Sequence, residues 1–171
     1  MHQRFNTISC FVFDMDGVLT DGSLLVLPNG VMARKMNIKD GFALQLAIKK
    51  GYQVMVVSGG NSPEAKDRLM KLGVTDVWME VKDKVSLLNK LLQDKKILPA
   101  QVLYMGDDIP DLGVMQMVGL PVCPADAVQD IKSISQYISH LKGGEGCVRD
   151  VIERVMKLRG DWDLHTDISA R

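Results

Sequence analysis

The sequence predicts an α/β fold: a three-layer, doubly wound parallel sheet with a small β-hairpin insertion and no separate cap domain. Short apolar runs that suit strands buried on both faces alternate with longer segments of helical character. Strands that alternate with helices form right-handed βαβ units, which build a sheet of this kind. Several of the apolar runs also end in acidic or small polar residues, as expected where such a sheet binds a ligand.

The 171 residues are enough for one well-formed core, and we expect a single domain over residues 1–160 with a hairpin insert at about 23–36. Residues 161–171 are polar and lack a periodic apolar pattern, so we expect a mobile tail there.

In the first half of the chain, proline, glycine, asparagine and serine residues mark the ends of the expected helices and strands. Pro28-Asn29-Gly30 lies between two apolar segments and predicts the hairpin turn. Ser62 is placed to cap a helix, with Pro63 at its first position. The elements expected here are a strand over 8–14, the hairpin, a helix over 39–51, a strand over 52–60 and a helix over 61–73.

The second half repeats the alternation. Val85, Leu88, Leu91 and Leu92 form one apolar stripe, which predicts an amphipathic helix. The expected elements are a strand over 74–79, a helix over 82–96, a strand over 102–108, a helix over 110–119, a strand over 120–124, a helix over 126–134, a short strand over 136–140 and a helix over 145–160.

Composition limits the function classes. Lys and Arg number 21, as do Asp and Glu, and this zero formal charge disfavours nucleic acid or an anionic membrane surface as a partner. No apolar run approaches the ~20 residues of a membrane span, and the N-terminus lacks the apolar core of a signal peptide. The cysteines, Cys10, Cys123 and Cys147, have no paired spacing and are expected to be free thiols in a reducing cytoplasm.

The polar residues that end the strands are expected to meet at one edge of the sheet. Carboxylates ~4 Å apart repel by about 4 kcal/mol at a surface-like dielectric, so a cluster of them needs a cation. Because every candidate ligand is an oxygen, we expect Mg²⁺ with phosphate in its shell. The residues in question are Asp14, Asp16, Ser58, Gly59, Asp107 and Asp108.

This set of groups suits phosphoryl transfer. One carboxylate can attack phosphorus and form an aspartyl-phosphate, provided that Mg²⁺ and a lysine compensate the repulsion between two anions. A second carboxylate, two positions further on, can give a proton to the leaving oxygen and later activate water.

Four motifs carry a family resemblance. "DMDGVLTDG" resembles the DxDGxxTDG motif of the haloacid dehalogenase-like phosphohydrolases, and "VVSGG" resembles their second motif. Lys84 in "VKDK" is similar in placement to the lysine of the third motif, and "YMGDDIPDLGVM" resembles the fourth, GDxxxD. All four occur in family order, and the resemblance implies the Rossmann-like fold of that superfamily.

A subgroup resemblance follows from the small size, the hairpin insert, "NIKDGFALQLAIKKG" and "KGGEGCVRDVIE". These are similar to the capless subgroup that includes 3-deoxy-D-manno-octulosonate 8-phosphate phosphatases and 9-phosphononulosonate phosphatases. The resemblance implies a keto-acid sugar phosphate as the small-molecule substrate. It also implies a homotetramer in which the hairpin and residues 143–149 complete a neighbour's site.

The resemblance also implies a role for each site residue. Asp14 would be the nucleophile and a metal ligand, Asp16 the acid/base and a ligand through its carbonyl, and Asp107 the third ligand. The remaining roles are phosphate binding for Ser58, Gly59 and Lys84; support of the site for Asp108 and Asp111; and substrate binding for Asp40, Gly41, Arg68 and Arg149. Arg149 suits a substrate carboxylate, because arginine binds carboxylates through two N–H groups.

Several alternatives stay open. Many of the octulosonate phosphatases that the chain resembles carry an arginine after the glycine of the second motif, and the nononulosonate enzymes carry a glutamate there. This chain has Gly60 and then Asn61 at that place. Lys82 is an alternative to Lys84 as the phosphate-binding lysine of the third motif. Asp21 suits a turn as well as a site. Other function classes are a phospho-accepting receiver, a non-catalytic partner of a synthase, and a phosphomutase. A phosphomutase would lack a cap to shield its aspartyl-phosphate.

Overall fold

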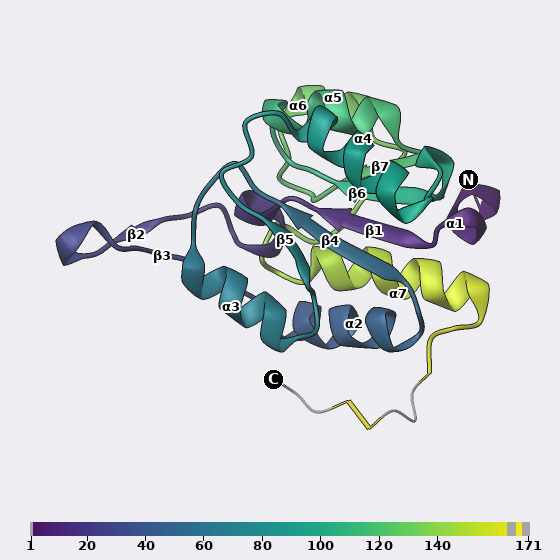
Figure 1. Cartoon of the computed structure of the whole chain (residues 1–171), viewed down its shortest axis with the longest axis horizontal. Coiled ribbons are helices and arrows are strands. Elements are labelled where there is room, and N and C mark those ends of the chain that lie inside the picture. Colours follow the sequence, from purple (N-terminus) through teal and green to yellow (C-terminus); the bar gives the residue numbers. More distant parts are fainter. Residues whose placement is uncertain (1, 164–166, 169–171) are drawn as a thin grey trace.

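The computed structural model describes residues 2–163, 167 and 168 (Figure 1), and within them the predicted α/β fold is confirmed. The main sheet has six strands in the order β5-β4-β1-β6-β7-β8, and every neighbouring pair is parallel. The strands are β1 Cys10–Phe13, β4 Gln53–Val57, β5 Asp76–Trp78, β6 Val102–Met105, β7 Leu120–Cys123 and β8 Tyr137–Ile138.

Helices cover both faces of this sheet. Figure 1 shows α4, α5 and α6 on one side and α2, α3 and α7 on the other, which makes three layers. Two apolar clusters match this arrangement, because successive residues of β1 point to opposite faces: Phe11 and Phe13 pack toward α2 and α7, and Val12 packs toward α4. The helices are α1 His2–Thr7, α2 Ile38–Lys49, α3 Pro63–Lys71, α4 Lys84–Lys95, α5 Leu112–Met117, α6 Gln129–Ile134 and α7 Cys147–Arg159.

Strand register brings the predicted site together. Phe13 at the end of β1 pairs with Val56 in β4 and with Met105 in β6. The segments that follow these strands therefore leave the sheet at the same edge and at nearly the same height. Asp14, Ser58 and Asp107 begin or lie within these segments.

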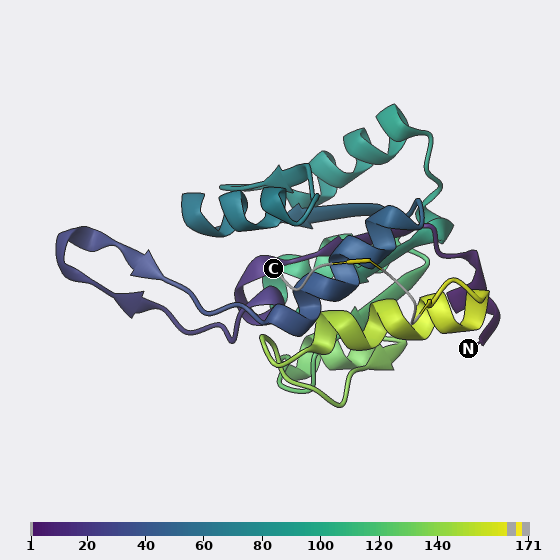
Figure 2. The same ribbon diagram turned by 90° about the horizontal axis from the view of Figure 1, so that it is seen from below.

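The hairpin insert forms as expected. Its strands are β2 Leu25–Val26 and β3 Met32–Ala33, and Asn29 and Gly30 at its tip have positive φ angles of 72° and 77°. Figure 2 shows it extending away from the rest of the chain. Asp21 accepts the N–H of Ser23 at 3.0 Å and pairs with Lys35 at 3.1 Å, so it shapes the entry to the hairpin.

Most differences from the expected elements are at their ends. Ser62 caps α3 as predicted, accepting the N–H of Ala65 at 3.3 Å, and the capping residue of α4 is Asp83. Helix α1 was not expected from the sequence; its Phe5 packs into the core. Part of the expected mobile tail, 164–166 and 169–171, lies outside the described residues, whereas Trp162 and Ile168 pack against the core, so mobility of 161–171 stays a prediction. No helix among the described residues is long and apolar enough to cross a membrane.

Candidate active site

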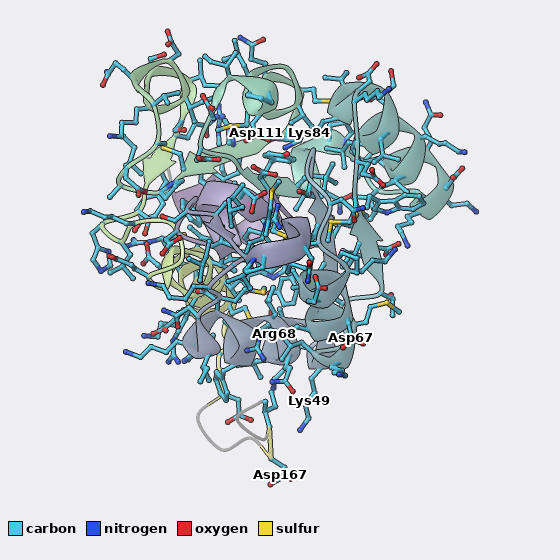
Figure 3. All side chains as sticks on the ribbon, turned by 90° about the vertical axis from the view of Figure 1, so that its left-hand side faces the viewer. Lys49, Asp67, Arg68, Lys84, Asp111 and Asp167 are labelled. Carbon is cyan, nitrogen blue, oxygen red and sulfur yellow. The ribbon has the colours of Figure 1, made fainter. Side chains whose placement is uncertain are left out.

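A cavity of about 410 Å³ lies where β4, β1 and β6 end. Figure 3 looks at the molecule from the hairpin side and shows Lys84 and Asp111 side by side, with Arg68 of α3 apart from them. The cavity collects most of the predicted site residues, namely Asp14, Asp16, Ser58, Gly59, Lys84, Asp107, Asp108 and Asp111.

The loop after β1 turns sharply, which lets Asp14 and Asp16 both line this cavity. Gly17 adopts a φ of 87°, and a Cβ at this position would collide with the Asp107 carboxylate, so only glycine fits. The hydroxyl oxygen of Thr20 accepts the N–H of Gly17 at 3.3 Å and that of Gly22 at 3.2 Å. The buried threonine thereby holds the turn closed.

Three carboxylates crowd the floor of the cavity. Asp14, Asp107 and Asp111 each offer an oxygen, and these oxygens all lie within 4.8 Å of one another. Burial, followed by the charge of Asp111, raises the pKa of Asp14 to about 6. Burial, followed by the charges of Asp14 and Asp111, raises the pKa of Asp107 to about 7. The cluster therefore resists full ionisation without a cation.

Lys84 is the cation that the protein itself places there. Its ammonium group donates to Asp14 Oδ1 at 2.9 Å and to Asp111 Oδ1 at 2.7 Å. Burial alone would lower the pKa of this lysine, but the two carboxylates outweigh burial and raise it. Asp111 is held further by the Tyr104 hydroxyl at 2.7 Å and by the backbone N–H of Asp107 at 3.2 Å. Lys82, the competing lysine, is exposed at the mouth of the cavity.

The donor set fits a magnesium ion. Asp107 Oδ1 is buried and has no hydrogen-bond partner among the described residues, a costly state that a bound cation relieves. Asp14, Asp107 and Asp111 offer only oxygen ligands, which suits Mg²⁺ better than a softer metal. Since Asp111 already accepts bonds at both oxygens, Asp14 and Asp107 are the better placed carboxylates.

Ser58 and Gly59 are uncharged residues that line the same cavity as the carboxylates. Ser58 is buried, and its oxygen accepts the N–H of Gly60 at 3.1 Å, while its hydroxyl proton can still be donated. Asp108 accepts the N–H of Ile109 at 2.8 Å and caps the turn that carries Asp111 into the cavity.

Two residues of the site were missed in the sequence. Arg34, at the base of the hairpin, binds Asp16 through two bonds, from Nε to Oδ1 at 2.7 Å and from Nη2 to Oδ2 at 3.1 Å. Tyr104 sits within a strand pattern that also suits a plain core tyrosine. No sequence signal separates Arg34 from Lys35: the two are adjacent cations at the end of the hairpin, and one contacts Asp16 while the other pairs with Asp21.

Four predicted substrate-binding residues lie outside the cavity. Arg68 lines a separate cavity of about 320 Å³ between the hairpin and α3, together with Arg34. Gly41 packs closely on α3, because a Cβ there would lie 3.3 Å from a Leu72 methyl group. Asp40 is 1% exposed, which leaves no surface for a substrate in this chain.

Arg149, the fourth, points away from the carboxylates. Its guanidinium lies 5.5 Å from the ring centre of Phe42 and 5.4 Å from that of Trp162, and it pairs with Glu153 at 3.1 Å. The structure therefore does not bring Arg149 to the site of its own chain, and its role in a neighbour's site stays a prediction.

Asp40 binds the first turn of α7, and its raised pKa makes its effect on stability testable. One of its oxygens accepts the Arg149 N–H at 2.8 Å in the first turn of α7, and the other is buried without a hydrogen-bond partner among the described residues. Burial, which outweighs the contacts with Arg149, raises the pKa of Asp40 to about 7. Because the folded state then holds a proton that the unfolded state loses above pH ~4, Asp40 costs stability increasingly as the pH rises from about 4 to about 7.

We expect Asp40→Asn to gain stability relative to the unmodified protein as the pH rises. One pKa unit corresponds to about 1.4 kcal/mol, so the gain between pH 4.5 and 8 is on the order of 3 to 4 kcal/mol. Urea unfolding of both proteins in EDTA at several pH values measures it. A stability difference that does not change with pH contradicts the assignment.

Comparison with known proteins identifies the class. A family model described as haloacid dehalogenase-like hydrolase matches residues 71–149, which include Lys84, Asp107 and Asp111. Together with the fold and the carboxylate site, this match defines the protein as a haloacid dehalogenase-like hydrolase. The 3-deoxy-D-manno-octulosonate 8-phosphate phosphatase of Salmonella typhi is 32% identical over 160 residues, covering 94% of this chain and 85% of the relative. The chain therefore belongs to the family of these phosphatases, which excludes the receiver alternative.

Solved structures agree. The octulosonate phosphatase of Yersinia pestis superposes with a TM-score of 0.91 at 31% identity, covering 94% of this chain and 86% of that one. The enzyme of Moraxella catarrhalis, solved with a magnesium ion, a phosphate ion and a KDO molecule, has a TM-score of 0.90 at 28% identity, covering 94% and 92%.

Proposed function

We propose that this protein hydrolyses 3-deoxy-D-manno-octulosonate 8-phosphate to the free keto-acid sugar and inorganic phosphate. The observation that carries the proposal is the buried Asp14–Lys84 pair, 2.9 Å apart, at the floor of an acidic cavity. The relatives named above that act on this substrate match nearly the whole chain.

Asp14 is the nucleophile in this proposal. Its carboxylate oxygen forms a bond to phosphorus, and the bond from phosphorus to the sugar oxygen breaks. Asp16, on the same loop, gives a proton to that leaving oxygen, so the sugar departs as an alcohol. Asp14 directly follows β1, and the turn at Gly17, just after Asp16, keeps both side chains at the cavity.

The phosphate is held from two sides. The Ser58 hydroxyl donates a hydrogen bond to a phosphate oxygen, and the backbone at Gly59 lies beside it on the cavity wall. Lys84 offsets the negative charge of Asp14 and of the transferring group. Mg²⁺, which Asp14, Asp107 and the carbonyl of Asp16 would hold, supplies further charge compensation when bound. Asp111 and Asp108 orient these groups.

The assembly belongs to the proposal as well. We expect a homotetramer that buries the hairpin, because its apolar side chains are unusually exposed: Leu25 is 64% and Val26 is 68% exposed in the single chain. A cytoplasmic location accords with the three buried cysteines, all free thiols. Light scattering of Leu25→Lys/Val26→Lys beside the unmodified protein tests the assembly, and a tetramer that survives both charges contradicts it.

An alternative substrate within the same chemistry is a 2-keto-3-deoxy-nononulosonate 9-phosphate. Position 60 favours neither substrate, since it is a glycine and not the arginine of the one group or the glutamate of the other group of enzymes. The chain could also serve as a non-catalytic partner, which measurable turnover excludes.

A side-by-side measurement of kcat/KM for the two keto-acid sugar phosphates tests the proposal. Glucose 6-phosphate serves as a sugar phosphate without a carboxylate. We expect the octulosonate phosphate to be turned over fastest. A higher kcat/KM for the nononulosonate phosphate replaces the substrate assignment, and no turnover of any phosphate ester contradicts the enzyme assignment.

A further inference from the structure

Arg34 binds both oxygens of a carboxylate in the site, and the proposed mechanism gives this arginine no role. Its guanidinium binds both oxygens of Asp16, at 2.7 and 3.1 Å, and Nη1 donates to the Met32 carbonyl at 3.2 Å. A two-point contact fixes the plane of a carboxylate as well as its place. The Arg34 side chain is only 6% exposed, so it is held in a defined position, whereas the Asp16 side chain is 33% exposed.

Gly60 makes this contact possible. A Cβ on Gly60 would lie 3.0 Å from Asp16 Oδ2 and 3.2 Å from Arg34 Nη2, so a larger residue would push into the pair. The same glycine donates its N–H to the Ser58 oxygen at 3.1 Å. The absent side chain at position 60 therefore leaves room for a guanidinium that arrives from the hairpin.

The pair suits one half of the reaction in particular. Once Asp16 has given its proton to the leaving oxygen, it is a carboxylate, and Arg34 matches that form because a guanidinium only donates hydrogen bonds. Hydrolysis of the aspartyl-phosphate needs this carboxylate as a base. Water bonds to phosphorus, its proton passes to Asp16, and the bond from phosphorus to Asp14 breaks, with the electron pair returning to the Asp14 carboxylate.

We propose that Arg34 is a positioning residue for this second half: its two-point contact aims the Asp16 carboxylate at the attacking water. The inference rests on the proposed function, because it takes Asp14 as the nucleophile and Asp16 as the base. A carboxylate freed from the pair can turn on its exposed side, and a misplacement of about 1 Å can cost on the order of 10²-fold in rate.

The test is pre-steady-state hydrolysis of p-nitrophenyl phosphate by Arg34→Gln. Its leaving group needs no proton, so formation of the aspartyl-phosphate continues while its hydrolysis slows. We expect a burst of nearly one p-nitrophenolate per active site, followed by turnover on the order of 10²-fold slower than in the unmodified protein. Intact-mass spectrometry after an acid quench then shows a covalently phosphorylated chain.

Lys35→Gln is the matched control, because it removes a neighbouring hairpin cation that pairs with Asp21 and is 77% exposed. It is expected to behave as the unmodified protein does. Gly60→Ala perturbs the pair without changing charge and is expected to enlarge the burst as well. This second variant keeps the test open if Arg34→Gln does not fold.

Slow turnover of folded Arg34→Gln without a burst or a phosphorylated chain overturns the proposal, as does unchanged turnover. A failure of the proposed function appears differently, since it removes turnover or the phosphorylated species from every variant, or shifts only the preferred sugar phosphate.

Discussion

Asp14→Asn is expected to abolish phosphate release while the protein stays folded. An amide is a poor nucleophile toward phosphorus, and loss of a covalent nucleophile costs on the order of 10⁴-fold or more in kcat. The fold should survive because asparagine has nearly the shape of aspartate. In addition, Lys84 keeps its 2.7 Å contact with Asp111.

Metal-free Asp14→Asn should in fact melt no lower than the metal-free unmodified protein. Burial and the charge of Asp111 already raise the pKa of Asp14 to about 6, so the carboxylate is costly in the folded state. Steady-state phosphate release and thermal unfolding in EDTA check both parts of this prediction.

Asp21→Asn is the matched control for Asp14→Asn. It changes an aspartate of the same loop that caps Ser23 and pairs with Lys35 away from the cavity, and we expect turnover within a few-fold of the unmodified protein. Phosphate release by folded Asp14→Asn above the background of the assay contradicts the nucleophile assignment.

Much of the site was predictable because parallel sheets restrict geometry. Residues that follow the strands of such a sheet lie at the same edge, which predicted the edge for Asp14, Ser58 and Asp107. They also lie close together because β4, β1 and β6 are adjacent in the sheet, an order that the sequence did not predict. Lys84 does not follow a strand directly, and its assignment came from the family resemblance; in the structure it opens α4, which Asp83 caps.

The residues that sequence reasoning missed or left unplaced depend on side-chain direction. Arg34 follows the two-residue strand β3, and its contact with Asp16 depends on how the end of the hairpin lies against the loop after β1. Arg149 packs against both Phe42 and Trp162, whose rings contact each other although they are over 100 residues apart in the chain, instead of facing its own site. Neither outcome has a periodic or spacing signal.

Metal requirement is the second large effect that we expect. Without a divalent cation, Asp14, Asp107 and Asp111 crowd within 4.8 Å, and one ammonium group balances them only in part. EDTA should therefore silence the enzyme completely, and Mg²⁺ should restore it. Because the ion binds only the folded site, saturating Mg²⁺ should also stabilise the protein, by about 2.7 kcal/mol at 100-fold above its dissociation constant.

In this experiment, Asp107→Asn distinguishes the effect of metal binding from the effect of the charge pairs around Lys84. The substitution removes the charge beside the unpartnered oxygen while leaving Lys84 and its two carboxylates in place. We expect the variant to lose both turnover and the rise in melting temperature with Mg²⁺, whereas Asp21→Asn keeps both. Full activity of the unmodified protein in EDTA would mean that Lys84 alone compensates the cluster, and the charge argument for the metal would then be wrong.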